Sequence, residues 1–354
     1  QLSKGRARVE ENGRFWIDFV QRDVRMAGHF GCVNDQAHAR QNPSGLGTTF
    51  GAAPPSALRF GESIEGYEAT GTAPNAAGIA LPETPTTGGT TYTPALPADI
   101  AAATANRVPN SDIIVLRYLA PESVPVTVIG GTANSPTFTF DKDRWDILRS
   151  GVDNPSLFGI SDCMNAMVFQ ASAIVENGTT RTVTAGEGAP ANESNPDKVF
   201  TAGQAMLSRA ESIVYYVGLD PNTRRPALYR TRFSAAPNLA VASDSQPMVD
   251  GIESLQLLYG QDRQLDPALS PTGYIERIGD AATVAASRPV AADAWRRVGS
   301  VQIGLVAVSP ERASSLQSQA PISAMGVSFN APNDGRYRTV YETTVALRNR
   351  LYGN

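Results

Sequence analysis

Two histidines, two cysteines and a pair of neighbouring aspartates are the residues of this chain whose types could support chemistry. His29 and His38 are the candidate bases, and their spacing alone leaves a Ser-His-Asp arrangement open. The chain has no Gly-x-Ser-x-Gly elbow, however, and His29 ends a helical pattern near Asp23 and Arg25, where a histidine is more often structural. An enzyme is therefore the least favoured class, and no catalytic residue is predicted.

Residues 45–51, Gly-Leu-Gly-Thr-Thr-Phe-Gly, contain glycines spaced as in some dinucleotide-binding loops. Such a loop requires a strand before it and a helix after it. No strand pattern precedes residue 45, so ordinary turns are the preferred interpretation and no cofactor is predicted.

Asp262 and Asp266 lie in a loop that follows a strand pattern, within residues 259–275. Loops rich in carboxylate oxygens can hold calcium. Because only these two carboxylates are present, with an arginine between them, they are weak calcium candidates and a solvated turn is favoured. No other metal ligands are predicted.

The two cysteines, Cys32 and Cys163, allow two interpretations. They could be buried free thiols, or they could form one disulfide in an oxidising compartment. Spacing does not decide between these alternatives. Together with the two histidines they match no zinc-binding pattern.

Composition bounds the class of protein. The chain is 42% hydrophobic and 18% charged, so it can bury a core. Its net charge of −4 gives no support for a nucleic-acid partner, which would favour a basic face. No run of 18 apolar residues predicts a membrane span within these residues, and no signal-peptide pattern is present.

The strongest local pattern is an amphipathic helix over residues 1–31. Helical spacing gathers apolar side chains on a face that should pack on the domain. The predicted core face consists of Phe15, Trp16, Phe19, Val20 and Val24. The helix also carries charges of both signs, at Arg14, Asp18, Arg22, Asp23 and Arg25. Gly28 and Gly31 predict where it stops.

Residues 32–354 are predicted to form a single β-rich globular domain. Within it, residues 33–110 are rich in Pro, Gly, Ala and Thr and show no sustained period. We expect a loop insertion there, with short strands at 57–60 and 67–69 and little contribution to the core.

Strand patterns dominate from residue 111 onward. Period-two alternation is clearest over 336–350 and predicts a strand with one buried and one wet face. One helix followed by mostly antiparallel strands predicts an α+β fold. The predicted strands are 111–120, 124–130, 137–140, 166–175, 211–219, 227–233, 251–260, 297–309 and 336–350.

The helix resembles the opening of the soluble part of PilW-type minor pilins of bacterial type IV pili. That family has a Glu-Asn-Gly-Arg-Phe motif, found here at residues 11–15, and an ending found here at residues 23–32. Further segments resemble the family in the same order along the chain. They are 111–119, 161–172, 248–262, 295–309 and 338–350, the last including the Thr343–Arg350 ending.

The resemblance implies a pilin-like fold, with a long N-terminal helix packed on antiparallel sheets. It implies that the apolar half of that helix precedes residue 1, so that the protein is anchored in the inner membrane with a periplasmic domain before it joins the extracellular pilus. Its implied role is to prime pilus assembly at or near the tip, with consequences for cell adhesion and twitching motility. Implied partners are other minor pilins, the major pilin and a PilY-type tip adhesin.

The resemblance also implies two features at the residue level. A disulfide between Cys32 and Cys163 follows from the periplasmic compartment and the matching segments. The mixed charges from Arg14 to Arg25 become a candidate assembly surface, since such charges set register between neighbouring helices.

Two other classes share part of this pattern. A J-type pseudopilin of type II secretion would have the same architecture in another machine, and its neighbouring genes would distinguish it. A secreted β-rich adhesin or binding module would lack an upstream hydrophobic helix.

Overall fold

Strands dominate the computed structural model, which describes residues 2–34, 45–312, 320–347 and 350. The protein is 44% strand and 16% helix, arranged in several sheets. The predicted α+β, pilin-like class is therefore wrong, and the fold is mostly β. Apart from α1 (Leu2–Met26), each helix of the described residues spans only three to six residues. Short strands without alternation escaped the sequence pattern and account for much of the difference.

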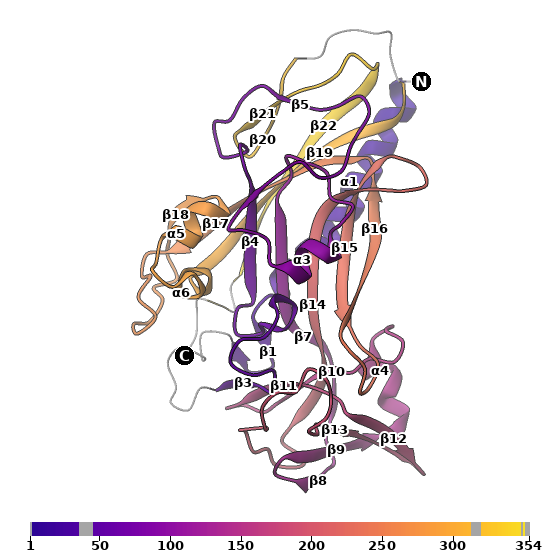
Figure 1. Ribbon diagram of the computed structural model, residues 1–354, viewed down its shortest axis with the longest axis vertical. Helices are drawn as coiled ribbons and strands as arrows, with labels where there is room; N and C mark the ends of the chain where they lie inside the picture. Colours follow the sequence, from indigo (N-terminus) through magenta and orange to yellow (C-terminus); the bar gives the residue numbers. More distant parts are fainter. Residues whose placement is uncertain (1, 35–44, 313–319, 348–349, 351–354) are drawn as a thin grey trace.

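The largest sheet has nine strands and runs through the middle of the molecule (Figure 1). Its strands are β3 (Leu46–Thr48), β11 (Ala166–Gln170), β10 (Leu157–Ser161), β14 (Met206–Leu219), β7 (Ile113–Pro125), β4 (Ile64–Ala69) and β6 (Tyr92–Thr93), in that order, with β15 (Pro226–Ser234) and β16 (Ala242–Asp250) continuing from β14. The pairs are antiparallel except β3 with β11. Nearly every residue of β14 is buried, including the charged Arg209 and Glu211.

A second, four-stranded antiparallel sheet is formed by the C-terminal part of the chain. Its order is β18 (Ile275–Gly279), β17 (Ile252–Asp262), β19 (Val298–Arg312) and β22 (Arg336–Ala346). The period-two alternation of β22 turns Tyr341 and Thr343 toward α1. The Tyr341 hydroxyl donates to the carbonyl oxygen of Val9 (2.7 Å), and the Gln21 amide donates to Thr343 Oγ1 (2.7 Å).

Three smaller sheets and the short helices complete the fold. The sheet of β8, β9, β12 and β13 lies at the end of the molecule opposite the N-terminus (Figure 1). The order of this sheet is β12 (Ala173–Asn177), β13 (Thr180–Thr184), β9 (Ser135–Asp141) and β8 (Val128–Thr132). A three-stranded sheet has the order β20 (Ile322–Ala324), β21 (Val327–Asn330) and β5 (Ile79–Ala80). The third sheet is the pair β1 (His29–Phe30) and β2 (Val33–Asn34). The helices are η1 (Ser56–Leu58), α3 (Ala98–Ala103), η2 (Lys142–Arg144), α4 (Trp145–Arg149), α5 (Ala281–Ala286) and α6 (Ala291–Arg296).

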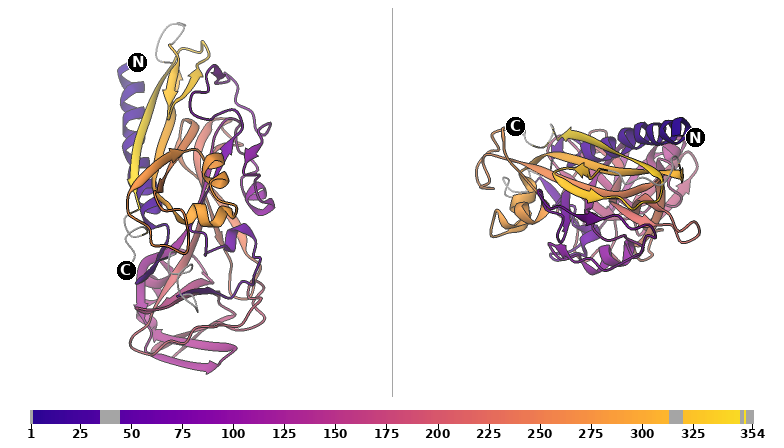
Figure 2. Two further views of the ribbon diagram at one scale, coloured as in Figure 1. Left: turned by 90° about the vertical axis from the view of Figure 1, so that its left-hand side faces the viewer. Right: turned by 90° about the horizontal axis from the view of Figure 1, so that it is seen from above.

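Helix α1 runs along one flank of the molecule, beside β19 and β22 (Figure 2). Trp16, Val20 and Val24 are buried in the largest hydrophobic cluster, together with side chains of β7, β14, β17 and β19. Gly13 allows α1 to pack closely against β22, because a Cβ atom at this position would lie 2.3 Å from Cζ of Tyr341. The glycine of the Glu-Asn-Gly-Arg-Phe motif is thus explained by packing.

The segment 33–110 contributes more to the core than expected. β4 pairs with β7 in the large sheet, and Phe50, Phe60 and Ile64 are fully buried. The expectation of little core contribution is therefore wrong. Apolar residues that stand singly among Gly and Pro show no period, yet each can still insert into a core. The division into a helix at 1–31 and one domain at 32–354 stays a prediction.

Ser111 and Asp112 fasten the two large sheets together. Asp112 accepts from the backbone N–H groups of Ala69 (2.9 Å) and Leu257 (2.9 Å), which belong to β4 and β17. Ser111 Oγ accepts from the N–H of Leu255 (2.9 Å). The first residues of the predicted strand 111–120 therefore act as a joint between sheets.

Candidate assembly surface and the adjoining cavity

The outer face of α1 presents most of the predicted charges to solvent. Arg14, Asp18, Arg22 and Arg25 are exposed. Phe15 is 62% exposed, so its assignment to the core face is wrong; the residue next to Trp16 on a helix lies about 100° around the axis from it. Its ring contacts the partly buried Phe19 edge-on, with centroids 5.4 Å apart.

Asp23 is the exception among the charged residues, because it is 1% exposed. It is therefore not part of a surface, which corrects the prediction. Tyr118 donates its hydroxyl to Asp23 Oδ1 (2.8 Å), and Tyr215 donates to Oδ2. Arg230 Nη1 lies 3.5 Å from Oδ2. Asp23 thus ties α1 to β7, β14 and β15.

The tyrosines respond to this environment. Burial, followed by the negative charge of Asp23, raises the pKa of Tyr118 well above its ordinary value. The same causes raise the pKa of Tyr215. Both hydroxyls therefore stay protonated and act as donors to the carboxylate near neutral pH.

A cavity of about 340 Å³ adjoins Asp23, between α1, β7, β14, β15 and the loop after α4. We call it the arginine cavity, because four guanidinium groups line it. They are those of Arg22, Arg209, Arg230 and Arg232. The carboxylates that line it are Asp23, Glu122 and Glu211.

Glu211 is the second buried carboxylate of the arginine cavity, at 3% exposure. Arg209 donates Nη1 to its Oε1, and Arg232 donates Nε to its Oε2 (3.1 Å). Arg209 also donates Nε to the carbonyl oxygen of Arg149 (3.1 Å). Each buried carboxylate of the cavity therefore has arginines beside it.

Sequence reasoning missed this cavity. Arg230 and Arg232 lie two residues apart in a mostly apolar strand, which places both on one face of β15. That alternation was a signal for a polar face. The contact with Asp23 and Glu211, which lie far away in sequence, required the fold.

Cys32 and Cys163 lie side by side at the surface, with their sulfur atoms 3.5 Å apart and both thiols free. A disulfide would bring the sulfurs to about 2.05 Å. The fold thus brings together the turn between β1 and β2 and the segment after β10, and the disulfide itself stays a prediction.

The Asp262 loop is organised by hydrogen bonds to its own backbone. Asp262 Oδ1 accepts from the N–H groups of Gln264 (2.8 Å) and Thr272 (2.9 Å), and Oδ2 accepts from that of Gly273 (2.6 Å). These bonds outweigh burial and lower the pKa of Asp262. Asp266 accepts separately, from the N–H of Ala268 (2.9 Å). The two aspartates therefore build turns instead of converging on a common point.

The described residues also contain no group of three or more His, Cys, Asp or Glu side chains placed to hold a metal ion. His29 lies in β1, where burial lowers its pKa. His38 lies outside the described residues. The glycine-rich run at 45–51 contains the edge strand β3. The next element is the three-residue 3-10 helix η1, whereas a dinucleotide-binding loop opens a longer α-helix.

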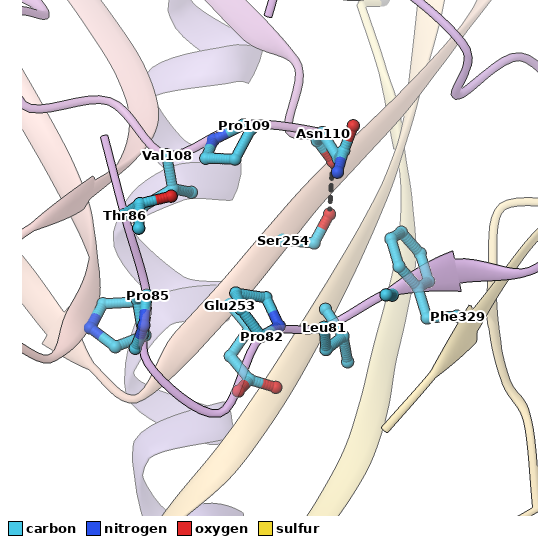
Figure 3. A pocket seen from close by; sticks show the side chains of 12 residues that line it. Leu81, Pro82, Pro85, Thr86, Val108, Pro109, Asn110, Glu253, Ser254 and Phe329 are labelled. Carbon is cyan, nitrogen blue, oxygen red and sulfur yellow. Dashed lines mark hydrogen bonds between the residues drawn. The ribbon is translucent and has the colours of Figure 1, made fainter. Parts of the chain in front are cut away.

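A further, small pocket lies between the segment after β5 and the start of β17 (Figure 3). Leu81, Val108 and Phe329 give it apolar walls, and Ser254 donates to the carbonyl oxygen of Asn110 (3.2 Å) at one side. Its volume of about 30 Å³ corresponds to little more than a water molecule. It is therefore too small for a ligand.

The described residues form a mostly β structure, with a helix whose outer face combines both signs of charge with an exposed aromatic ring. Residues 214–349 match the family model of the Type IV Pilus-assembly protein W, so the predicted PilW-type resemblance is confirmed over this range. The match supports involvement in type IV pilus assembly and an association with the cell envelope. The family is not known as an enzyme family.

The other comparisons add no relative, since no curated protein and no solved structure matches the chain. Among the described helices, none is both long enough and apolar enough to cross a membrane.

Proposed function

We propose that the protein is a minor pilin that primes type IV pilus assembly and lies at or near the pilus tip, in a complex with other minor pilins, the major pilin and a PilY-type adhesin. The observation that carries this proposal is the match of residues 214–349 to a pilus-assembly family. In this proposal the domain faces the periplasm before assembly and later belongs to the extracellular pilus, where it contributes to adhesion and twitching motility.

The outer face of α1 supports a role in binding other subunits. Arg14 and Asp18 provide opposite charges one helical turn apart, and Phe15 is exposed beside them. Mixed charges favour one register between partners, while an aromatic side chain supplies contact area. Pairwise binding in solution should be weak, because subunits assembled in a membrane gain from a high local concentration.

The test combines genetics with co-purification. Deleting the gene should abolish or strongly reduce piliation, and the wild-type gene should restore it. A double variant, Arg14→Glu with Phe15→Ala, should restore it poorly. Arg144→Glu is the matched control, since Arg144 is exposed in η2 and is not part of α1.

The protein should also co-purify with the minor pilins and the adhesin encoded beside it. If no combination forms a complex and the deletion strain is fully piliated, the priming role is wrong and a secreted binding module replaces it. A deletion that blocks protein secretion instead of piliation would identify a type II pseudopilin.

A further inference from the structure

The charges of the arginine cavity do not balance. Four guanidinium groups face three carboxylates, and only two of these, Asp23 and Glu211, are buried in its wall. The third, Glu122, is exposed at the rim. A recessed site with surplus positive charge attracts an anion, because low-dielectric walls around it strengthen the field.

Two of the arginines also have donors to spare. Arg232 uses Nε for Glu211, and the Nε of Arg22 lies 3.8 Å from Asp23 Oδ1, beyond hydrogen-bond distance. Within the described part of the chain, no hydrogen bond engages the terminal nitrogens of either guanidinium. Since a guanidinium carries five N–H donors, both can bind a further acceptor that enters the cavity.

We propose that the arginine cavity binds a carboxylate supplied by a partner subunit, from an Asp or Glu side chain or a chain terminus, and that Arg22 and Arg232 hold it. Arginine pairs with carboxylates through two parallel hydrogen bonds. The volume of the cavity falls within the range of ligand sites, about 300 to 1,000 Å³.

The position of the cavity favours a protein carboxylate over a free anion. Arg22 belongs to both the cavity and the outer face of α1, so a subunit seated on that face would reach the opening. Met26 and Ile213 add apolar wall beside the arginines, which suits the aliphatic stem of a glutamate. The inference rests on the proposed function and names the chemistry by which a partner is held.

Calorimetry on the purified protein at low ionic strength tests the proposal. The probe is a glutamate tripeptide blocked at both ends, and inorganic phosphate serves as the free-anion comparison. Arg22→Gln and Arg232→Gln should each weaken peptide binding by about tenfold, the loss expected for one charge-assisted hydrogen bond. Arg144→Gln should bind like the wild type. Circular dichroism should show that each variant is folded.

Arg232→Gln could disturb the buried Glu211 and so lower binding indirectly. Arg22→Gln avoids this problem, because the Arg22 side chain is 68% exposed and its replacement should leave the fold intact. Absence of peptide binding by the wild type, or equal binding by all variants, would overturn the proposal. Phosphate bound as tightly as the peptide would overturn the assignment to a partner carboxylate. Each of these results is independent of piliation in the deletion strain, so the proposed function can stand when this inference fails.

Discussion

Two buried aspartates, Asp23 and Asp112, each join separate parts of this fold, and they differ in the partners that surround them. We call them and their partners the Asp23 centre and the Asp112 centre. The Asp23 centre joins α1 to the large sheet through Tyr118, Tyr215 and Arg230. The Asp112 centre joins the two large sheets, where Asp112 accepts from two backbone N–H groups and from the hydroxyl of Thr72. The first centre pairs its carboxylate with a cation, while the second places another acid, Glu68, nearby.

The pKa values of the acids in the Asp112 centre are raised. Burial, and then the charge of Asp112, raises the pKa of Glu68 to about 10. Burial raises the pKa of Asp112 to about 7, although its two backbone hydrogen bonds oppose the shift. Burial and the charges of Asp112 and Glu68 also raise the pKa of Tyr259. In this centre the neighbouring acid thus adds to the effect of burial and raises the pKa of Glu68 further.

The largest effect should follow from removing the carboxylate of the Asp23 centre. Asp23→Ala leaves two tyrosine hydroxyls without their acceptor and Arg230 without its counter-charge. Breaking a buried pair in this way should lower the free energy of unfolding by about 3–5 kcal/mol. Urea denaturation at pH 7 measures it. A loss below that of an ordinary surface substitution would show that Asp23 does not tie down the helix.

The Asp112 centre should make stability depend on pH. The ordinary pKa values of Glu68 and Asp112 are 4.5 and 3.8, and both are raised in the folded state. The folded protein therefore binds protons more tightly than the unfolded chain. The stabilisation is complete below the ordinary values and is lost as the pH rises through about 7 for Asp112 and about 10 for Glu68.

Replacing Glu68 by glutamine isolates this effect. Glu68→Gln keeps a neutral side chain of the same shape, so it should raise the free energy of unfolding by roughly 1–3 kcal/mol at pH 8 and change it little at pH 4.5. Denaturation at both pH values measures the difference. Glu83→Gln is the control, because Glu83 is exposed. An equal gain for Glu68→Gln at both pH values would contradict the assignment of a raised pKa.

The sequence predicts some elements of this fold well and others not at all. Period-two alternation located β22, and glycines at 28 and 31, which adopt positive φ angles of 82° and 71°, marked the region where α1 ends. The class was wrong, since strands as short as β5 and β6 show no alternation to detect. Local pattern identifies long elements but not pairings between distant short ones.

Prediction of the candidate site from sequence has the same limit. The charge pattern of α1 identified Arg14, Asp18, Arg22 and Arg25 as exposed positions, but it could not show that Asp23 turns inward. Adjacent helical residues differ by about 100° in direction, and only the partners on other strands decide which of two adjacent charges is buried. Those partners lie 95 or more positions away in sequence.

An intermediate effect should come from the other half of α1, which contacts β22 without buried charge. Gly13→Ala places a methyl group against the ring of Tyr341, which is held by its hydrogen bond to Val9. The overpacking should outweigh the better helix propensity of alanine and cost about 1–2 kcal/mol. The loss should be the same at pH 5 and pH 8, in contrast to Glu68→Gln. A stabilised Gly13→Ala variant would show that Tyr341 moves aside freely.

The smallest effect should come from the other aspartate of the same helix. Asp18 lies five positions before Asp23 but is exposed, and no hydrogen bond or ion pair engages its side chain within the described residues. Asp18→Ala should therefore change the free energy of unfolding by no more than about 0.5 kcal/mol. Urea denaturation of Asp18→Ala and Asp23→Ala under the same conditions measures both losses. The two variants carry the same substitution on one helix, at an exposed and at a buried position. Similar losses at both positions would mean that helix content, instead of the buried carboxylate, sets the stability of this flank.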